Sequence, residues 1–359
     1  MSAVYIIAEA GVNHNGKPDM AFHLVDAAVE AGADAVKFQT FKAKNIVTNS
    51  AEKAEYQKQT TGSSETQFEM LKSLELPQEL HRDLIKYCQK KKIEFLSTAF
   101  DLESLDFLAN SLKLKTLKIP SGEITNGPLL LAYARTRCKL ILSTAMATLG
   151  EIEKALGVLA FGLKNYNSIK PSKTAFQQAY FSEEGQKTLK KKVTILHCTA
   201  EYPAPANEIN LNAMQTMRTA FGLQTGYSDH SEGIIVPIAA TAMGAVVIEK
   251  HFTLDRTLPG PDHKASLEPD ELKEMVKAIR TVEQSMGDGL KGPMPSEQKN
   301  RLIARKSIIA VKDIKQGEKF TKDNITVKRP GTGSSPMEYW DLIGKKAQID
   351  ILQDTVIKQ

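Results

Sequence analysis

Cysteine is scarce in this chain. Only three cysteines occur in 359 residues, Cys88, Cys138 and Cys198, and no two of them have the spacing of a zinc-ligand pair. An odd, small number of cysteines argues against a disulfide-stapled secreted domain. We therefore expect three reduced core thiols in a cytoplasmic protein.

Long apolar runs and concentrated charge are also missing. The opening stretch MSAVYIIAEAG has no basic segment, and no apolar run in the chain approaches the ~20 residues that span a bilayer. Lysine and arginine (47) slightly exceed aspartate and glutamate (42), giving a net charge of +5 spread along the chain. We expect no signal peptide, no membrane span and no nucleic-acid binding, and a mild preference for anionic small ligands.

What the chain does contain is eight short apolar runs that end in polar residues. They occupy residues 4–9, 35–40, 94–100, 117–123, 140–145, 193–201, 224–230 and 246–252. Continuous rather than alternating apolarity is typical of strands buried on both faces of a parallel sheet.

Amphipathic stretches separate these runs. Prolines fit their first turns and glycines fit their ends, as in a predicted helix that begins at Pro269 and is capped by Gly287. Alternating strands and helices predict a (β/α)8 barrel of the TIM type. A doubly wound sheet is the alternative, but EAGVNHNG lacks the GxGxxG turn that usually follows its first strand.

Further segments define the predicted domains. The connection 41–71 follows the second strand, so it would lie on the catalytic face and could form a lid. The polar stretch 164–192 belongs on the opposite face as a solvated insertion. We expect a barrel at 1–287, a Gly/Pro-rich linker at 288–300 and a small, mainly β domain at 301–359.

Two histidines end consecutive runs, His230 and His251. Barrel active sites form at the carboxyl ends of the strands, and neighbouring strands lie about 4.8 Å apart. Two imidazoles at matching height could therefore hold one divalent ion and leave positions open for water and substrate. A local hydrogen bond at each strand end is the alternative.

Other strand-end residues suit an anion and proton transfer. One charge and several hydroxyls could hold a carboxylate and a phosphate on Lys37, Thr98, Ser121 and Ser228. Glu9 and Glu123 are acid–base candidates, although each could instead pair with a lysine at the barrel mouth.

Three further histidines are weaker candidates. His14 lies in the turn VNHNG and could be a site residue or a solvent-exposed turn residue. His197 lies inside an apolar run and fits the core. His263 lies beyond the last strand, where it has no partner at matching height.

Several of these motifs resemble the sialic acid synthase family. The segments that carry the resemblance include IIAEAGVNHNG, KIPSGEITN, HCTAEYPAP, GYSDHSEG and VIEKHFTLD. KSIIAVKDIKQGE and VKRPGTG resemble that family's C-terminal antifreeze-like (SAF) domain. The resemblance spans essentially the whole chain and implies a transferase that condenses phosphoenolpyruvate with an N-acylated mannosamine-type sugar and releases phosphate.

The resemblance also implies roles for individual positions. The divalent metal, Mn²⁺ or Mg²⁺, which polarises the open-chain aldehyde of the sugar, would be bound by His230 and His251. Phosphoenolpyruvate would be held by Lys37, Thr98, Ser121 and Ser228. The sugar would be contacted by Gln39, Glu123, Tyr202 and Asp262. Glu9 would lie near the reacting carbons. Arg329 would reach the acyl group from the SAF domain of the other subunit, which implies a domain-swapped homodimer.

The chain departs from the family pattern at three positions. Ala200 stands where N-acetylneuraminate enzymes carry Asn, Ala145 where Gly is usual, and Arg305 where an aromatic residue is often found. With IPSGEITN, these departures favour the branch that makes N,N'-diacetyllegionaminate from 2,4-diacetamido-2,4,6-trideoxymannose over the branch that uses N-acetylmannosamine.

Two other functions compete with this interpretation. A metal-dependent sugar isomerase could use the same pair of histidines in a barrel, but it would release no phosphate. An ice-binding or structural protein would need a flat, threonine-rich face, whereas residues 301–359 are rich in charge.

Overall fold

The computed structural model describes residues 3–53, 55–61, 66–164 and 169–358. The chain divides into two compact units, Met1–Gly287 and Asp288–Gln359. No helix in these described ranges is long and apolar enough to cross a membrane.

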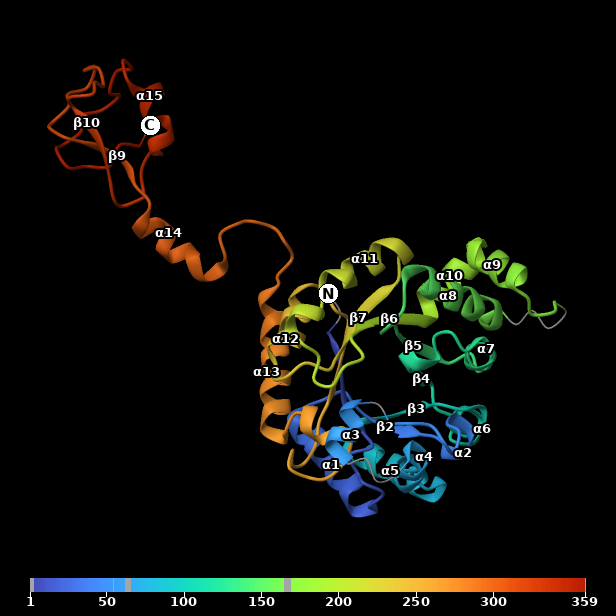
Figure 1. Ribbon diagram of the computed structural model, residues 1–359. Coiled ribbons are helices and arrows are strands. Elements are labelled where there is room, and N and C mark those ends of the chain that lie inside the picture. Colours follow the sequence, from blue (N-terminus) through green and yellow to red (C-terminus); the bar gives the residue numbers. More distant parts are fainter. Residues whose placement is uncertain (1–2, 54, 62–65, 165–168, 359) are drawn as a thin grey trace. The chain divides into compact units, whose positions relative to one another are not determined.

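The first unit is a closed parallel barrel (Figure 1). In the described part of the chain its strands are β1 (Tyr5–Gly11), β2 (Ala35–Thr40), β3 (Glu94–Ala99), β4 (Thr116–Ile119), β5 (Lys139–Ser143), β6 (Val193–Cys198), β7 (Gln224–Asp229) and β8 (Val247–His251). Each strand pairs in parallel with the next, and β8 closes the barrel by pairing with β1. The predicted (β/α)8 barrel is confirmed.

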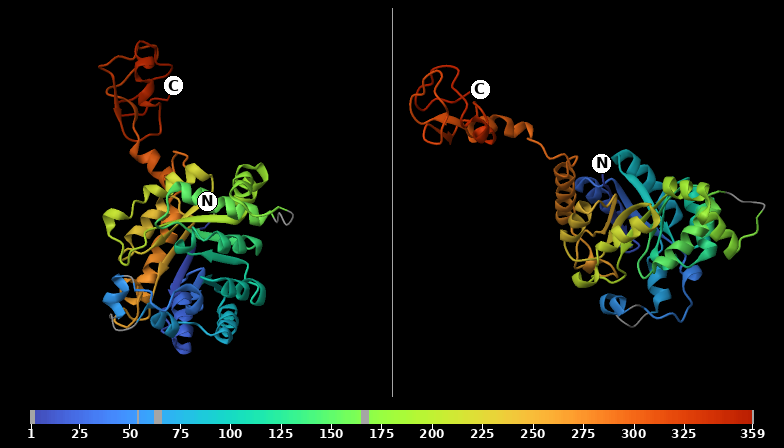
Figure 2. Two further views of the ribbon diagram at one scale, coloured as in Figure 1. Left: turned by 45° about the vertical axis from the view of Figure 1, so that its right-hand side comes forward. Right: turned by 90° about the horizontal axis from the view of Figure 1, so that it is seen from above.

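Helices surround the barrel, as both views of Figure 2 show. The helices that follow individual strands include α1 (Pro18–Ala31), α5 (Gln78–Lys91), α6 (Leu102–Asp106), α7 (Gly127–Arg135), α8 (Leu149–Leu163), α11 (Asn212–Phe221), α12 (Ile235–Ala242) and α13 (Pro269–Ser285). Pro269 opens α13 as predicted; Met286 is its C-cap, and Gly287 follows with the left-handed backbone (φ 61°) of a glycine that terminates a helix. Gly32 caps α1 with a left-handed backbone (φ 80°), a conformation that glycine adopts without steric cost.

The two long connections are partly helical. The segment predicted as a lid carries α2 (Ala43–Ile46), α3 (Glu55–Thr61) and α4 (Gln67–Ser73), and its residues 54 and 62–65 lie outside the described residues. The insertion before β6 carries α9 (Lys173–Phe181) and α10 (Glu183–Lys192), and its residues 165–168 also lie outside the described ranges. Both helices of the insertion pack on α8.

The interior of the barrel is divided into an apolar part and a polar part. Inward-facing apolar side chains fill the half nearer the amino ends of the strands: Ile7, Ala35, Leu96, Ile141, Leu196 and Val247. Larger apolar clusters fill the layer between the strands and the surrounding helices. Because the amino-terminal half of the lumen is occupied in this way, inward-facing polar groups gather at the carboxyl ends of the strands.

The second unit is small and built around two antiparallel strands, β9 (Ser307–Ala310) and β10 (Ile325–Lys328). It also contains α14 (Gln298–Ala304) and α15 (Tyr339–Leu342). Its core includes the buried residues Ile308, Phe320, Ile325 and Ile357. The predicted small, mainly β second domain is confirmed.

Gly226 in β7 has no room for a side chain. A Cβ at this position would lie 2.5 Å from the Val247 carbonyl oxygen and 2.7 Å from Leu196 Cδ2. We expect Gly226→Ala to lower the free energy of unfolding by about 1–3 kcal/mol, because the backbone of β8 must move. Urea denaturation followed by circular dichroism measures this loss.

Gly150 provides the matched control. It lies in α8, and no neighbouring group in the described part of the chain stands within 4 Å of the Cβ that alanine would add. Gly150→Ala should be neutral or stabilising by up to ~1 kcal/mol, because alanine favours helix. Equal stability of the two variants would contradict close packing at Gly226.

Candidate functional site

Four buried charged side chains meet at the carboxyl ends of the strands. Glu9 on β1 lies 2.5 Å from the Lys37 ammonium on β2, and Lys37 lies 3.4 Å from Glu249 on β8. Lys118 on β4 donates to the other oxygen of Glu249 at 2.9 Å. A buried charge is costly without a partner, so two lysines and two glutamates compensate one another. We call these four residues the charge cluster.

Hydroxyl groups extend the charge cluster. The Lys37 ammonium donates to Thr98 Oγ1 at 3.0 Å, and Ser228 Oγ donates to Glu249 Oε1 at 2.8 Å. Thr98 and Ser228 are both buried. The cluster therefore offers two ammonium groups and two hydroxyls from strands β2, β3, β4 and β7, which is a donor set suited to a carboxylate or phosphate.

The two carboxylates of the cluster have different proton affinities. Burial raises the pKa of Glu9 to about 7, and the nearby Lys37 only partly opposes this rise. Burial would also raise the pKa of Glu249, but Lys118 and Lys37 outweigh it and hold that pKa well below its usual range. Glu9 can therefore exchange a proton near neutral pH while Glu249 stays charged.

The histidines His230 and His251 lie side by side beyond β7 and at the end of β8. Their ring centroids are 5.7 Å apart. His230 Nδ1 donates to the Thr199 carbonyl at 2.6 Å, so its Nε2 carries the lone pair and lies 2.9 Å from the Tyr202 hydroxyl. His251 Nδ1 is buried and, among the described residues, has no hydrogen-bond partner. Asp262 Oδ2 lies 3.9 Å from it.

Both rings are held neutral. Burial lowers the pKa of His230 to about 4 and lowers that of His251 well below its usual value, where His230 and Lys37 act in the same direction. A metal ligand requires a neutral imidazole with an available lone pair. His251 Nδ1 has no partner among the described residues, whereas His230 Nε2 faces the Tyr202 hydroxyl, which a metal would displace. Burial also raises the pKa of Asp262 to about 6.

The pair would form an open metal site rather than a closed one. Within the described ranges, no three His, Cys, Asp or Glu side chains converge in a metal-binding arrangement. The orphaned nitrogen of His251 and the lone pair of His230 fit a two-ligand site that leaves positions for water and substrate.

The remaining barrel candidates lie around these groups. The Tyr202 ring stacks on His230 with centroids 4.0 Å apart and meets His251 edge-on. Gln39 is half-buried and is the register partner of Thr98. The candidates Ser121 and Glu123 bound a 3₁₀ turn directly after β4. In that turn Glu123 accepts a hydrogen bond from Asn126 at 2.6 Å, and no ion pair with a lysine, the alternative to its acid–base role, is seen among the described residues.

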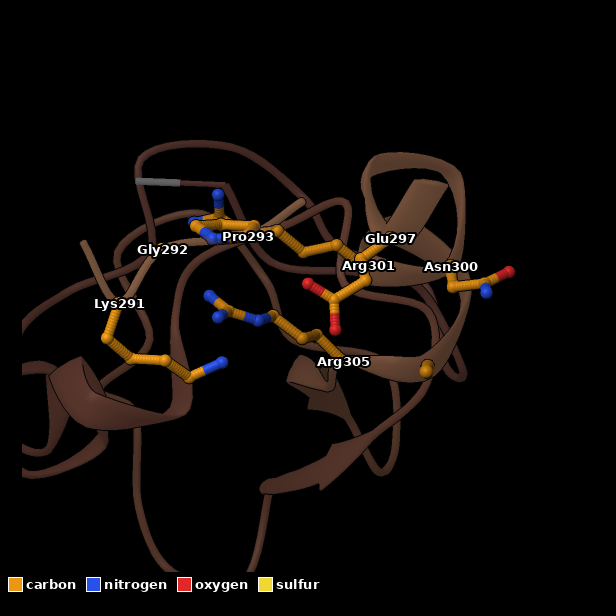
Figure 3. A pocket seen from close by; sticks show the side chains of 8 residues that line it. Lys291, Gly292, Pro293, Glu297, Asn300, Arg301 and Arg305 are labelled. Carbon is orange, nitrogen blue, oxygen red and sulfur yellow. The ribbon is translucent and has the colours of Figure 1, made fainter. Parts of the chain in front are cut away.

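Arg329 lies in the second unit, directly after β10. Its Nε donates to the Ala304 carbonyl at 3.0 Å. The same unit has a hollow of about 520 Å³, and Figure 3 shows the charged ends of Lys291, Glu297, Arg301 and Arg305 around it. All four of these side chains are exposed.

Lys118 was missed by the sequence analysis. Its ammonium completes the charge cluster, and Lys118 is the register partner of the candidate Thr98. The sequence feature that could have identified Lys118 is its position inside the apolar strand TLKI. Its neighbours Leu117 and Ile119 face outward into the helix layer. Strand alternation therefore places Lys118 in the lumen.

The cysteines were predicted as three core thiols, and this prediction is wrong for Cys138, which is only partly buried. Cys88 and Cys198 are buried. Cys198 lies beside the site, with its Sγ 3.6 Å from His230 Nδ1. Burial raises the pKa of the Cys198 thiol to about 11, so it stays protonated.

The weaker histidine candidates have local partners. His14 is fully buried and accepts the Gly16 N–H, so the solvent-exposed alternative is wrong. His197 Nε2 bonds to the carbonyl of Ile209 at 2.6 Å. His263 lies between Thr253 Oγ1 at 2.7 Å and Asn15 Oδ1 at 3.1 Å, so it joins the loops that follow β8 and β1.

Glu9 should leave a signature in the pH dependence of stability. Between its ordinary pKa of 4.5 and about 7, the folded chain keeps a proton that the unfolded chain releases, so this residue lowers stability as pH rises. At ~1.4 kcal/mol per pKa unit the loss reaches at most about 3.5 kcal/mol. Relative to the wild type, Glu9→Gln should therefore gain stability from pH 5 to pH 8.

Denaturant titrations at both pH values measure this effect. Glu153→Gln, at an exposed position of α8, controls for the chemistry of the substitution. Parallel pH profiles for the wild type and Glu9→Gln would show that Glu9 does not hold its proton in the folded state.

Comparison with known proteins places this geometry in a family. Residues 24–291 match the NeuB family, and residues 305–359 match the SAF domain. The chain is 51% identical to the N,N'-diacetyllegionaminic acid synthase of Campylobacter jejuni over the full length of both proteins. It is 46% identical to the enzyme of the same name from Legionella pneumophila, over 98% of this chain and 93% of that one.

A solved structure agrees. The N-acetylneuraminic acid synthetase of Leptospira borgpetersenii, in complex with citrate, superposes with a TM-score of 0.66 at 33% identity. The match covers 83% of this chain and 90% of the other. The barrel with its strand-end charge cluster and its SAF domain therefore belongs to the NeuB family.

Proposed function

We propose that this protein is a nonulosonic (sialic) acid synthase that condenses phosphoenolpyruvate with an N-acylated mannosamine-type sugar and releases phosphate. The observation that carries the proposal is the charge cluster at the strand ends beside two neutral histidines, His230 and His251. Glu9 of the cluster is the register partner of His251, so the anion-binding groups and the histidines share one mouth of the barrel.

The sugar we propose is 2,4-diacetamido-2,4,6-trideoxymannose. Two relatives that span nearly the whole chain at 51% and 46% identity are named N,N'-diacetyllegionaminic acid synthase. N-Acetylmannosamine is the alternative, because the solved relative at 33% identity is named for N-acetylneuraminic acid.

Phosphoenolpyruvate would bind at the charge cluster. Lys37 and Lys118 supply two positive charges for its carboxylate and phosphate, and Thr98, Ser121 and Ser228 supply hydroxyl donors. Ala200 has no side-chain donor and adds none to this set. When the anion binds, Lys37 and Lys118 would contact it, and their ion pairs with Glu9 and Glu249 would weaken.

His230 and His251 would hold a divalent metal, Mn²⁺ or Mg²⁺, which supplies Lewis-acid polarisation of the sugar aldehyde when bound. The sugar would be contacted by Gln39, Glu123, Tyr202 and Asp262. Tyr202 stacks on His230, which supports a contact between its phenol and the carbonyl end of the sugar.

The reaction forms one carbon–carbon bond and one carbon–oxygen bond, the latter from water, and breaks the carbon–oxygen bond to phosphate. The double-bond electrons of phosphoenolpyruvate attack the aldehyde carbon through C3, and the aldehyde oxygen takes up a proton. Water then adds to the cation at C2, and Glu9 accepts the proton that this water loses. A pKa of about 7 suits Glu9 to that exchange. The tetrahedral product loses phosphate by cleavage of the bond between C2 and the phosphate oxygen. The C2 hydroxyl gives its proton to the departing phosphate, and a 2-keto acid remains.

The active form we propose is a domain-swapped homodimer in the cytoplasm. Residues 1–287 form the catalytic domain, 288–300 a linker and 301–359 the SAF domain, whose Arg329 reaches the sugar of the other subunit. Exposed apolar side chains support the pairing: Met146 on the loop after β5, Ile235 at the start of α12, and Met337 and Trp340 in the second unit. A second copy would remove this apolar surface from water.

Phosphate release tests the reaction. With Mn²⁺ and phosphoenolpyruvate, we expect the diacetamido sugar to give a kcat/KM about tenfold above that of N-acetylmannosamine, as far as a few pocket contacts can discriminate. His230→Ala and His251→Ala should each lower kcat at least roughly 100-fold, the scale for loss of an electrostatic catalyst.

His23→Ala, at an exposed position of α1, should keep wild-type activity and serves as the matched control. Phosphate release at background level with both sugars would refute the synthase proposal. Conversion of a sugar without phosphoenolpyruvate would favour the isomerase instead.

Subunit mixing tests the shared site. Arg329→Ala and His251→Ala subunits should each be inactive alone, because one lacks the sugar contact and the other a metal ligand. Mixed dimers contain one site with an intact barrel and an intact Arg329, so random mixing should restore about a quarter of wild-type activity. Verified heterodimers without activity would show that Arg329 does not serve the partner's barrel.

A further inference from the structure

We infer that Asp229 and Lys250 form a positioning pair that fixes the spacing of the two histidines. This inference rests on the proposed function, because it takes His230 and His251 as the ligands of a divalent metal. Neither Asp229 nor Lys250 touches the lumen, so both would act through the neighbouring histidines and not on the substrate.

The sequence places each member of the pair directly before a histidine. Asp229 precedes His230 at the end of β7, Lys250 precedes His251 on β8, and Asp229 and Lys250 are register partners. Because side chains alternate along a strand, the histidines face the lumen and the pair faces the surrounding helices. The two strands are thereby joined on their outer face at the height where the histidines meet on the inner face.

The pair is completely buried. The Lys250 ammonium lies 2.7 Å from Asp229 Oδ2, and both side chains have 0% exposure. Its neighbours on the same face, Tyr227 and Ile248, belong to the apolar layer between the barrel and its helices. Water therefore neither screens this ion pair nor replaces it.

The pair also holds the main chain just after His230. Lys250 Nζ donates to the carbonyl oxygen of Ser231, and the Ser231 N–H donates to Asp229 Oδ1 at 2.9 Å. The Tyr227 hydroxyl donates to the same aspartate oxygen at 3.1 Å. His230 is therefore fixed from both sides in sequence, by Asp229 before it and by the bonded Ser231 after it.

Stability alone does not explain such a pair. Removing two charges from water costs several kcal/mol per ion, and well-packed apolar residues of similar volume are often at least as stabilising. The strands already have their ladder hydrogen bonds and an apolar layer behind them. What the ion pair adds is geometric specificity, because it fixes the position of the end of β7 relative to β8.

Metal binding depends on that geometry. The two imidazole centroids are 5.7 Å apart, and metal–nitrogen bonds require both nitrogens within about 2.1 Å of the ion. A shift of β7 against β8 would move one ring out of reach. The pair behind the histidines acts like the outer-shell partners of metal ligands, whose loss typically weakens metal affinity about 10- to 100-fold.

The test is the affinity of the full chain for Mn²⁺ alone, measured by electron paramagnetic resonance of the free ion. Asp229→Asn/Lys250→Met removes both charges together, so no uncompensated charge is left in the apolar layer. We expect Mn²⁺ affinity to fall about tenfold, with a thermal midpoint equal to or above that of the wild type. Lys250→Arg, which keeps the charge, should retain most of the affinity.

Two further variants separate positioning from folding. Asp34→Asn/Arg280→Met removes the ion pair of 2.7 Å between Asp34 and Arg280, remote from the histidines, and should leave Mn²⁺ affinity unchanged. Tyr227→Phe removes only the hydroxyl that bonds Asp229 and should weaken Mn²⁺ binding roughly threefold. If the Asp229→Asn/Lys250→Met variant does not fold, the Mn²⁺ affinity of Tyr227→Phe tests the positioning role instead.

The outcomes are distinguishable. Folded variants of Asp229, Lys250 and Tyr227 that bind Mn²⁺ like the wild type would overturn the positioning role. A wild-type chain that binds no Mn²⁺ would overturn the metal site and this inference with it. A wild-type chain that binds Mn²⁺ but releases no phosphate would refute the synthase proposal, and the loss of affinity in the variants would still establish the positioning pair.

Discussion

The compensation of buried charge is the constraint on which the site depends. Lys37 and Lys118 can be withdrawn from water only because Glu9 and Glu249 stand against them. The same burial keeps His230 and His251 neutral and raises the proton affinity of Glu9. The anion binding, metal binding and proton transfer that we propose thus share one physical origin, a buried and balanced set of charges at the barrel mouth.

The register of the barrel determines which groups meet. Glu9 is opposite Lys37 on one side and His251 on the other, and Thr98 is opposite both Gln39 and Lys118. A parallel barrel brings the carboxyl ends of all its strands to one mouth. The half of the lumen nearer the amino ends is filled with apolar side chains, which cannot bind a polar ligand. A change of one residue in register would turn each of these side chains from the lumen to the helix layer.

A second set of buried charges lies on the outer face of β7 and β8, on the side of these strands opposite the histidines. The Asp229–Lys250 pair repeats on the outer face of β7 and β8 the joining that a bound metal would make on the inner face. The ion pair and the proposed metal would both join the ends of β7 and β8. The ion pair does so from the helix layer, so it leaves the lumen free for substrate.

The sequence by itself determined the barrel, the small C-terminal domain and the strand-end positions of most candidates. The strands could be predicted because buried parallel strands have continuous apolar sequences. The site residues could be predicted because the family resemblance assigns a role to individual positions. The sequence did not reveal Lys118, hidden inside TLKI, nor that His14 is buried and Cys198 lies against His230. Those depend on distances between strands far apart in the chain, because only closure of the barrel brings β4, β6, β7 and β8 to one mouth. Tertiary structure alone therefore decided which charges pair, which titrate near neutral pH and which stand behind the histidines.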